Sequence, residues 1–163
     1  MEKVQVIMGS ISDWETMKEA VNVLSSFNIA YDVHIISAHR TPQRMIDYAK
    51  SLLENEVEVV IAGAGGAAHL PGMVAANTIV PVIGVPVMSK ALHGVDSLLS
   101  IVQMPSGIPV ATTAIGTSGA KNAGYLAAQI LAINDQSIKN KLLTYRQGLA
   151  EKVVESEREL NEK

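Results

Sequence analysis

Three short segments of the sequence combine the residue types that bind phosphate, bind sugar hydroxyls and move protons. The first is Gly9-Ser10-Ile11-Ser12-Asp13, which follows an apolar run and precedes a helical pattern. Serine hydroxyls beside the free N–H groups of a helix start form an anion site, although Ser12 is equally well explained as a helix cap. A carboxylate would repel phosphate, so we expect Asp13 to accept hydrogen bonds from sugar hydroxyls instead.

The second segment, Ser37-Ala38-His39-Arg40-Thr41-Pro42, places a hydroxyl, an imidazole and a guanidinium in one loop. Arg40 can bind phosphate through two parallel N–H bonds. The imidazole of His39 can act as an acid or a base in catalysis. A solvated turn is the less favoured interpretation, because the strands before the first two segments are expected to be neighbours.

The third segment, Gly63-Ala-Gly-Gly-Ala-Ala-His69, consists almost entirely of small residues, which let the backbone approach a ligand closely. It lacks the acidic residue about 20 positions further on that a dinucleotide-binding fingerprint requires. His69 is expected to face the same cleft as the other two segments, whereas His34 and His93 are better explained as ordinary packed or loop histidines. The histidines are scattered and no carboxylate cluster has ligand spacing, so we expect no metal site.

The elements that position these segments alternate between strand and helix along the chain. Hydrophobic patterning predicts strands over 4–8, 30–36, 57–62, 82–87 and 110–114. Helices are predicted from Ser12, with Glu15 completing a capping box, from Thr41-Pro42, and over 70–77, 95–102, 120–133 and 135–160.

This alternation, with strands that are apolar on both faces, predicts an α/β protein with a parallel sheet covered by helices on both sides. We expect a three-layer flavodoxin-like sheet of order 2-1-3-4-5 with an extra C-terminal helix. The chain would form one domain over 1–163, with its core at about 3–133. Ligands of such folds bind at the carboxyl ends of the strands.

Composition narrows the class of protein further. Hydrophobic residues make up 48% of the 163 residues, so we do not expect a disordered chain. The formal net charge is −3 without a basic run, so we expect neither nucleic-acid binding nor association with a membrane. The absence of cysteine excludes a thiolate nucleophile, disulfides and Cys-ligated metals. Met1-Glu-Lys leads directly into a strand-like run, so we expect no signal peptide and a cytoplasmic location.

Taken together, the three segments resemble those of the class I PurE family, the N5-carboxyaminoimidazole ribonucleotide mutases of purine biosynthesis. The resemblance continues through Gly84-Val-Pro-Val87, residues 96–105 and residues 107–112, and covers about residues 4–133 in the family's order. It implies a shift of a carboxylate from the exocyclic nitrogen of an aminoimidazole ribonucleotide to ring carbon 4, without metal, ATP, biotin or other cofactor. It also implies a homo-octamer.

The resemblance assigns roles to individual residues. His39 corresponds to the catalytic histidine and His69 to a second histidine of the site. The implied substrate-binding residues are Ser10, Ser12, Asp13, Ser37, Ala38, Arg40, Gly65, Gly66, Ala67 and Leu70. Carbamates release carbon dioxide readily, so we expect a tight pocket that holds the gas beside carbon 4 while His39 moves protons.

Two alternatives remain open. A class II relative would carboxylate aminoimidazole ribonucleotide directly with free carbon dioxide, and it shares the phosphate and histidine loops. A non-catalytic flavodoxin-like nucleotide-binding module is the alternative from another class; a phosphoacceptor receiver would need an aspartate where the third strand instead reaches Gly63.

Overall fold

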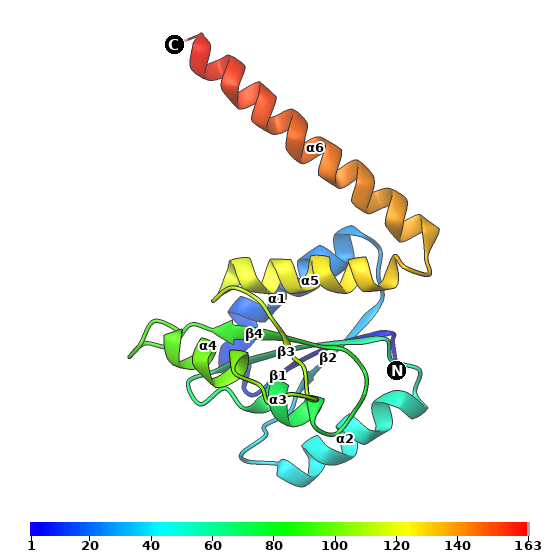
Figure 1. The fold of residues 1–163 in the computed structure, drawn as a ribbon, viewed down its shortest axis with the longest axis vertical. Coiled ribbons are helices and arrows are strands. Elements are labelled where there is room, and N and C mark those ends of the chain that lie inside the picture. Colours follow the sequence, from blue (N-terminus) through cyan, green and yellow to red (C-terminus); the bar gives the residue numbers. More distant parts are fainter. Residues whose placement is uncertain (163) are drawn as a thin grey trace.

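Five parallel strands form the centre of the molecule in a computed structural model that describes residues 1–162 (Figure 1). The strands are β1 (Val4–Met8), β2 (Tyr31–Ile35), β3 (Val59–Gly65), β4 (Val82–Val87) and β5 (Ala111–Thr112). Their order is β2-β1-β3-β4-β5, and every paired strand is parallel. The predicted flavodoxin-like order is confirmed.

Helices cover both faces of the sheet (Figure 1). They are α1 (Trp14–Ser26), α2 (Pro42–Glu54), α3 (Leu70–Ala75), α4 (Val95–Val102), α5 (Thr117–Leu131) and α6 (Gln136–Asn161). On β1, Val4, Val6 and Met8 pack with α1 and α5, whereas Ile7 packs with α2, α3 and α4. This alternation follows from the two-residue period of a strand, and it explains why β1 is apolar at nearly every position.

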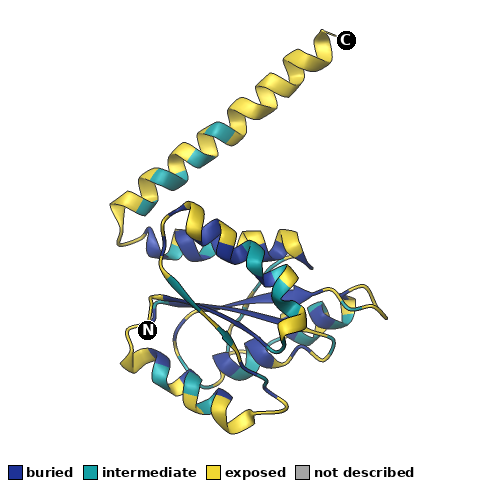
Figure 2. Ribbon diagram, turned by 180° about the vertical axis from the view of Figure 1, so that it is seen from behind, coloured by how far each residue is buried: buried dark blue, intermediate teal, exposed yellow. Residues whose placement is uncertain are grey.

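The last helix, α6, projects away from the body of the molecule (Figure 1). It begins after Asp135, whose carboxylate accepts hydrogen bonds from the backbone N–H groups of Ser137 and Ile138. Ile138, Leu142 and Tyr145 pack against the α1–α5 side of the core, and the rest of α6 is largely exposed (Figure 2). The predicted polar C-terminal helix is confirmed. Within residues 1–162, no helix is both long and apolar enough to cross a membrane.

The start of the first helix differs from the prediction. Ser12 lies inside a single 3₁₀ turn, Ile11–Asp13, and it does not cap α1, which begins at Trp14. Ser10 caps the 3₁₀ turn, since its hydroxyl accepts a hydrogen bond from the Ser12 N–H, and Asp13 precedes α1 without a side-chain cap bond. The Asp13 N–H donates to the Ser10 carbonyl at 3.1 Å, three residues back, which is the bond of a 3₁₀ turn, and the α-helix starts after it.

Several other boundaries also differ. β3 runs three residues further than predicted, to Gly65, because it pairs with β4 as far as Val87. β5 is only two residues long, since it lies at the edge of the sheet and pairs with β4 alone. α3 ends at Ala75, two residues before the predicted end at Asn77. α5 starts at Thr117, because Gly116 adopts a φ of 77° that turns the chain into the helix earlier than predicted.

Candidate active site

The three segments meet in one cleft at the carboxyl ends of β1, β2 and β3. The parallel register sets Met8 beside both Ile35 and Gly63, so the loops that follow these residues emerge side by side. The cleft has a volume of about 390 Å³. It is lined by Gly9, Ser10, Ser12, Asp13, Ser37, Ala38, His39, Arg40, Ala64, Gly65, Ala67, His69 and Leu70.

The two histidines of the cleft contact each other directly. Nε2 of His39 and Nδ1 of His69 are 2.9 Å apart, and the two rings are nearly perpendicular, at 87°. One of these nitrogens must carry the proton and the other must accept it, so the tautomer of each ring depends on the other. Both side chains are exposed to the cleft, where a ligand can reach them.

Arg40 ties the first loop to the second. Its Nη2 donates to the backbone carbonyl of Gly9 at 3.0 Å, and its Nε donates to the Ser37 hydroxyl at 3.2 Å. A guanidinium has five N–H donors, so three remain for a ligand. These bonds hold the positive charge at the mouth of the cleft, beside the serines of the first loop.

The carboxylate of Asp13 lies half-buried at the base of the first loop. Burial raises the pKa of Asp13 above its ordinary value, because it disfavours the charged form. Backbone N–H groups of Ser10 and Gly9, the Ser12 hydroxyl and the charge of Arg40 oppose this effect on the pKa without cancelling it. A ligand that supplies further hydrogen-bond donors would therefore stabilise the ionised carboxylate.

Gly66 is the one predicted site residue that does not line the cleft. Its backbone N–H donates to the Ser97 hydroxyl at 2.9 Å, and its carbonyl accepts a bond from the Ser100 hydroxyl at 3.1 Å, so both groups point to α4. Gly9 and Ala64 line the cleft without having been predicted individually, although both flank the predicted loops. His34 and His93 lie outside this lining, as expected.

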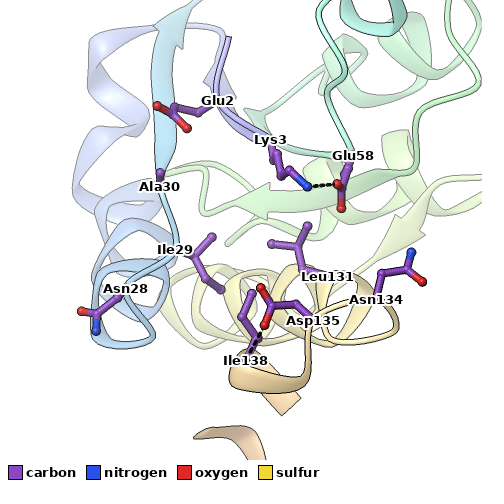
Figure 3. Close-up of a pocket in the computed structure, with 10 residues that line it drawn as sticks. All are labelled: Glu2, Lys3, Asn28, Ile29, Ala30, Glu58, Leu131, Asn134, Asp135 and Ile138. Carbon is purple, nitrogen blue, oxygen red and sulfur yellow. Dashed lines mark hydrogen bonds and ion pairs between the residues drawn. The ribbon is translucent and has the colours of Figure 1, made fainter. Parts of the chain in front are cut away.

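A second cavity lies at the opposite end of the sheet, near the amino ends of β1, β2 and β3. It has a volume of about 240 Å³, and Figure 3 shows that Lys3 and Glu58 form an ion pair at its wall. Asp135 also lines it, but its carboxylate is occupied in capping α6. No predicted site residue reaches this cavity. Within residues 1–162, no group of three or more His, Cys, Asp or Glu residues could hold a metal ion.

Comparison with known proteins places the chain in a family. Residues 3–152 match the family model described as AIR carboxylase. The N5-carboxyaminoimidazole ribonucleotide mutase of Bacillus subtilis is 59% identical over 96% of this chain and 97% of its own length. The mutase of the same name from Escherichia coli K12 is 54% identical over 94% of this chain and 91% of its own.

Solved structures agree with the sequence relatives. The crystal structure of Treponema denticola PurE superposes with a TM-score of 0.85 at 31% identity, covering 93% of this chain and 94% of that one. The family match over residues 3–152 includes all five strands and every residue that lines the cleft. The chain belongs to the AIR carboxylase family.

Proposed function

We propose that this protein is a mutase of purine biosynthesis that converts N5-carboxyaminoimidazole ribonucleotide to 4-carboxy-5-aminoimidazole ribonucleotide. The observation that carries the proposal is the hydrogen-bonded pair His39–His69, which shares one cleft with Arg40 and Asp13. Relatives of 54% and 59% identity that bear the name of this mutase support it.

The first two loops bind the ribonucleotide in this proposal. The three remaining donors of Arg40 and the hydroxyls of Ser10 and Ser12 meet the 5′-phosphate, because charge-assisted bonds to phosphate are strong. Asp13 accepts hydrogen bonds from the ribose hydroxyls. These bonds replace the water that burial removes from the carboxylate, so they are worth more here than at a solvated aspartate.

The third loop and the histidines act on the imidazole. The bond between the exocyclic nitrogen and the carboxylate carbon breaks, its electron pair stays on nitrogen, and His39 delivers a proton there. Carbon 4 then attacks the released carbon dioxide and loses its own proton to His39. The net proton change is nil, so one imidazole performs both transfers while its bond to His69 selects the reactive tautomer.

Retention of carbon dioxide requires close walls. Ala64, Gly65 and Ala67 line the cleft and carry only hydrogen or methyl side chains, so the substrate ring can lie against the backbone. The substrate itself covers the opening of such a cleft, which limits the escape of a small neutral molecule.

Direct carboxylation is the second candidate, because the matching family model is described as AIR carboxylase. In that case aminoimidazole ribonucleotide would enter the same cleft and free carbon dioxide would be captured. The 54–59% identity to relatives that bear the name of the mutase favours the first candidate.

Isotope labelling separates the two candidates. The purified protein converts unlabelled N5-carboxyaminoimidazole ribonucleotide in buffer with ¹³C-bicarbonate, and the mass of the product is read directly. We expect product that carries the substrate's own unlabelled carboxylate. Labelled product, together with turnover of aminoimidazole ribonucleotide at low bicarbonate, would instead identify the carboxylase.

We further propose that the protein is a cytoplasmic single-domain enzyme that works as a homo-octamer without cofactor or metal, as the resemblance implies. Exposed aliphatic side chains support self-association. Leu92, Val95, Leu99 and Val102 lie three or four residues apart along α4 and the turn before it, and all are exposed. A monomer would leave this stripe in water.

A further inference from the structure

The glycine loop of the cleft is attached to a helix that does not itself line the cleft. Ser97 and Ser100 lie one turn apart on α4, and both bond to Gly66, 31 and 34 residues earlier in the chain. We propose that these two serines are positioning residues, which hold Gly66 so that the adjoining wall of the cleft and His69 keep their places for catalysis.

Ser97 connects the ends of two strands. It is fully buried, and its hydroxyl donates to the Val87 carbonyl at 2.6 Å while it accepts the Gly66 N–H at 2.9 Å. One hydroxyl therefore satisfies a backbone group at the end of β4 and another in the loop after β3. Without the hydroxyl both groups would lack these partners, and the Gly66 backbone would have to shift to recover a hydrogen bond.

Ser100 adds a second attachment at the same residue. Its hydroxyl lies 3.1 Å from the Gly66 carbonyl and 2.7 Å from the Asp96 carbonyl one turn earlier, so it can bond to either. The N–H and the carbonyl of Gly66 are thus both directed to α4. Gly66 has a φ of 68°, a conformation in which the backbone turns sharply.

The attachment sets the direction of the residues that follow. The Gly66 carbonyl also accepts the Ala68 N–H at 2.9 Å, and the Ala67 carbonyl accepts the His69 N–H at 2.9 Å. This short chain of bonds runs from α4 to the backbone of His69, whose ring is 2.9 Å from His39. A shift of Gly66 would therefore move both the small-residue wall and the second histidine.

The hydroxyls of Ser97 and Ser100 bond to backbone groups and not to Arg40 or Asp13, so their removal should lower kcat more than it weakens substrate binding. In Ser97→Ala we expect kcat to fall about 10–100-fold, since a misplacement of about 1 Å at a reacting centre costs up to about that much. KM should change less than about threefold. Ser100→Ala keeps the Ser97 bonds and should lose about 2–5-fold in kcat, and Ser100→Thr, which keeps a hydroxyl, should restore it.

The matched control is Ser51→Ala in α2, which removes a similar hydroxyl-to-carbonyl bond, that to Tyr48, far from the cleft. Its kcat and its carboxylate retention should equal those of the parent protein. In Ser97→Ala, ¹³C-bicarbonate should enter the product more than in the parent, because the loosened wall releases carbon dioxide. This kinetic part rests on the proposed mutase function.

A second readout is independent of activity. Histidine-ring ¹⁵N NMR of the unliganded protein reports the tautomers of His39 and His69, which their mutual bond fixes. We expect Ser97→Ala to move these signals toward tautomer averaging, and Ser51→Ala to leave them unchanged. Unchanged signals in both Ser97→Ala and Ser100→Ala would overturn the inference, even if the parent protein fails to convert the ribonucleotide. Such a failure would overturn the proposed function alone.

Discussion

His39 is the residue on which the proposed chemistry depends most directly. Asparagine at this position keeps a hydrogen-bonding group near His69 but cannot exchange a proton near neutral pH. We expect His39→Asn to bind the ribonucleotide with an affinity close to that of the parent, measured by calorimetry. Its kcat should fall at least 10²–10⁴-fold, the usual effect of losing a general acid–base group, because both proton transfers are lost.

His93→Asn is the matched control for this variant. His93 has a φ of 51°, a conformation that asparagine adopts readily, and it lies outside the residues that line the cleft. Its kcat should equal that of the parent. Near-normal turnover in His39→Asn would show that another group moves the protons.

Asp13 combines a binding role with a cost in stability. Its pKa is raised by burial, so the ionised form is less favourable in the folded protein than in the unfolded chain. We expect Asp13→Asn to weaken ribonucleotide binding about tenfold or more, the effect of losing a hydrogen bond to a charged group. The free energy of unfolding at pH 7 should rise, because the neutral amide avoids the cost of burying a charge.

The expected gain in stability of Asp13→Asn depends on pH. A carboxyl group with a raised pKa binds protons more tightly when folded, so the parent gains stability as pH falls through that raised pKa. The advantage of Asp13→Asn is therefore complete above the raised pKa and disappears below the ordinary value of 3.8. Urea unfolding at several pH values measures it, with exposed Asp47→Asn as the control. An advantage that grows toward acid would contradict the assignment.

At the residue scale, the sequence was sufficient to identify the loops but not their internal contacts. Serine, aspartate, histidine and arginine directly after consecutive parallel strands must meet, because the register of a sheet fixes where those strands end. The bonds from Gly66 to α4 could not be predicted in this way, since they join residues 31 and 34 positions apart that share no periodicity. The only signal was Ser97 and Ser100, spaced three apart on an apolar helix.

The contact between α1 and α5 depends on the absence of a side chain at Gly124. A Cβ there would lie 2.8 Å from Cβ of Val23 and 2.9 Å from the Ala20 carbonyl. We expect Gly124→Ala to lower the free energy of unfolding by about 1–3 kcal/mol, because overpacking forces the two helices apart. Denaturant unfolding measures the change.

Gly148→Ala in α6 is the opposite case. A Cβ at Gly148 would have no atom within 4 Å outside its own helix, so the substitution gains only helix propensity. The free energy of unfolding should stay equal or rise by up to about 1 kcal/mol. If both substitutions were equally neutral, the α1–α5 contact would be looser than the structure shows.

At the scale of elements, the period of hydrophobicity predicted the type and order of the strands and helices, and local geometry set their ends. β4 (Val82–Val87) and α4 (Val95–Val102) match their predicted bounds. β5 does not, because its length depends on pairing with Ile83 and Gly84 alone. α1 does not, because Ile11–Asp13 form a 3₁₀ turn that the Ser10 hydroxyl caps, and the α-helix begins after it.

At the scale of the whole molecule, α6 leaves apolar side chains that the body of this chain does not cover. Leu143 is exposed although it lies within the part of α6 that packs on the core, and Val153 and Leu160 are exposed beyond that part. The sequence predicted a polar helix with few apolar positions, but not the direction in which α6 projects (Figure 1). Ile138, Leu142 and Tyr145 fix its first part against the core. A second copy of the chain is the partner that the proposed octamer supplies.

The exposed stripe on α4 offers the clearest test of that assembly. Leu99 lies at the middle of the stripe and is exposed, so glutamate fits there without strain in the monomer. We expect Leu99→Glu to place four or more like charges at equivalent contacts of a symmetric assembly. Analytical ultracentrifugation should then show the parent as a large complex and the variant as smaller species with an unchanged circular dichroism spectrum.

The control Asn22→Glu adds the same charge to the exposed face of α1, outside both apolar surfaces, and should leave the large complex intact. Because α4 also carries Ser97 and Ser100, loss of the neighbouring copy would leave the helix that holds Gly66 uncovered on one side. We therefore expect turnover to fall together with assembly in Leu99→Glu. A monomeric parent would contradict the proposed octamer, and a fully active monomer of Leu99→Glu would show that the stripe serves a contact unrelated to catalysis.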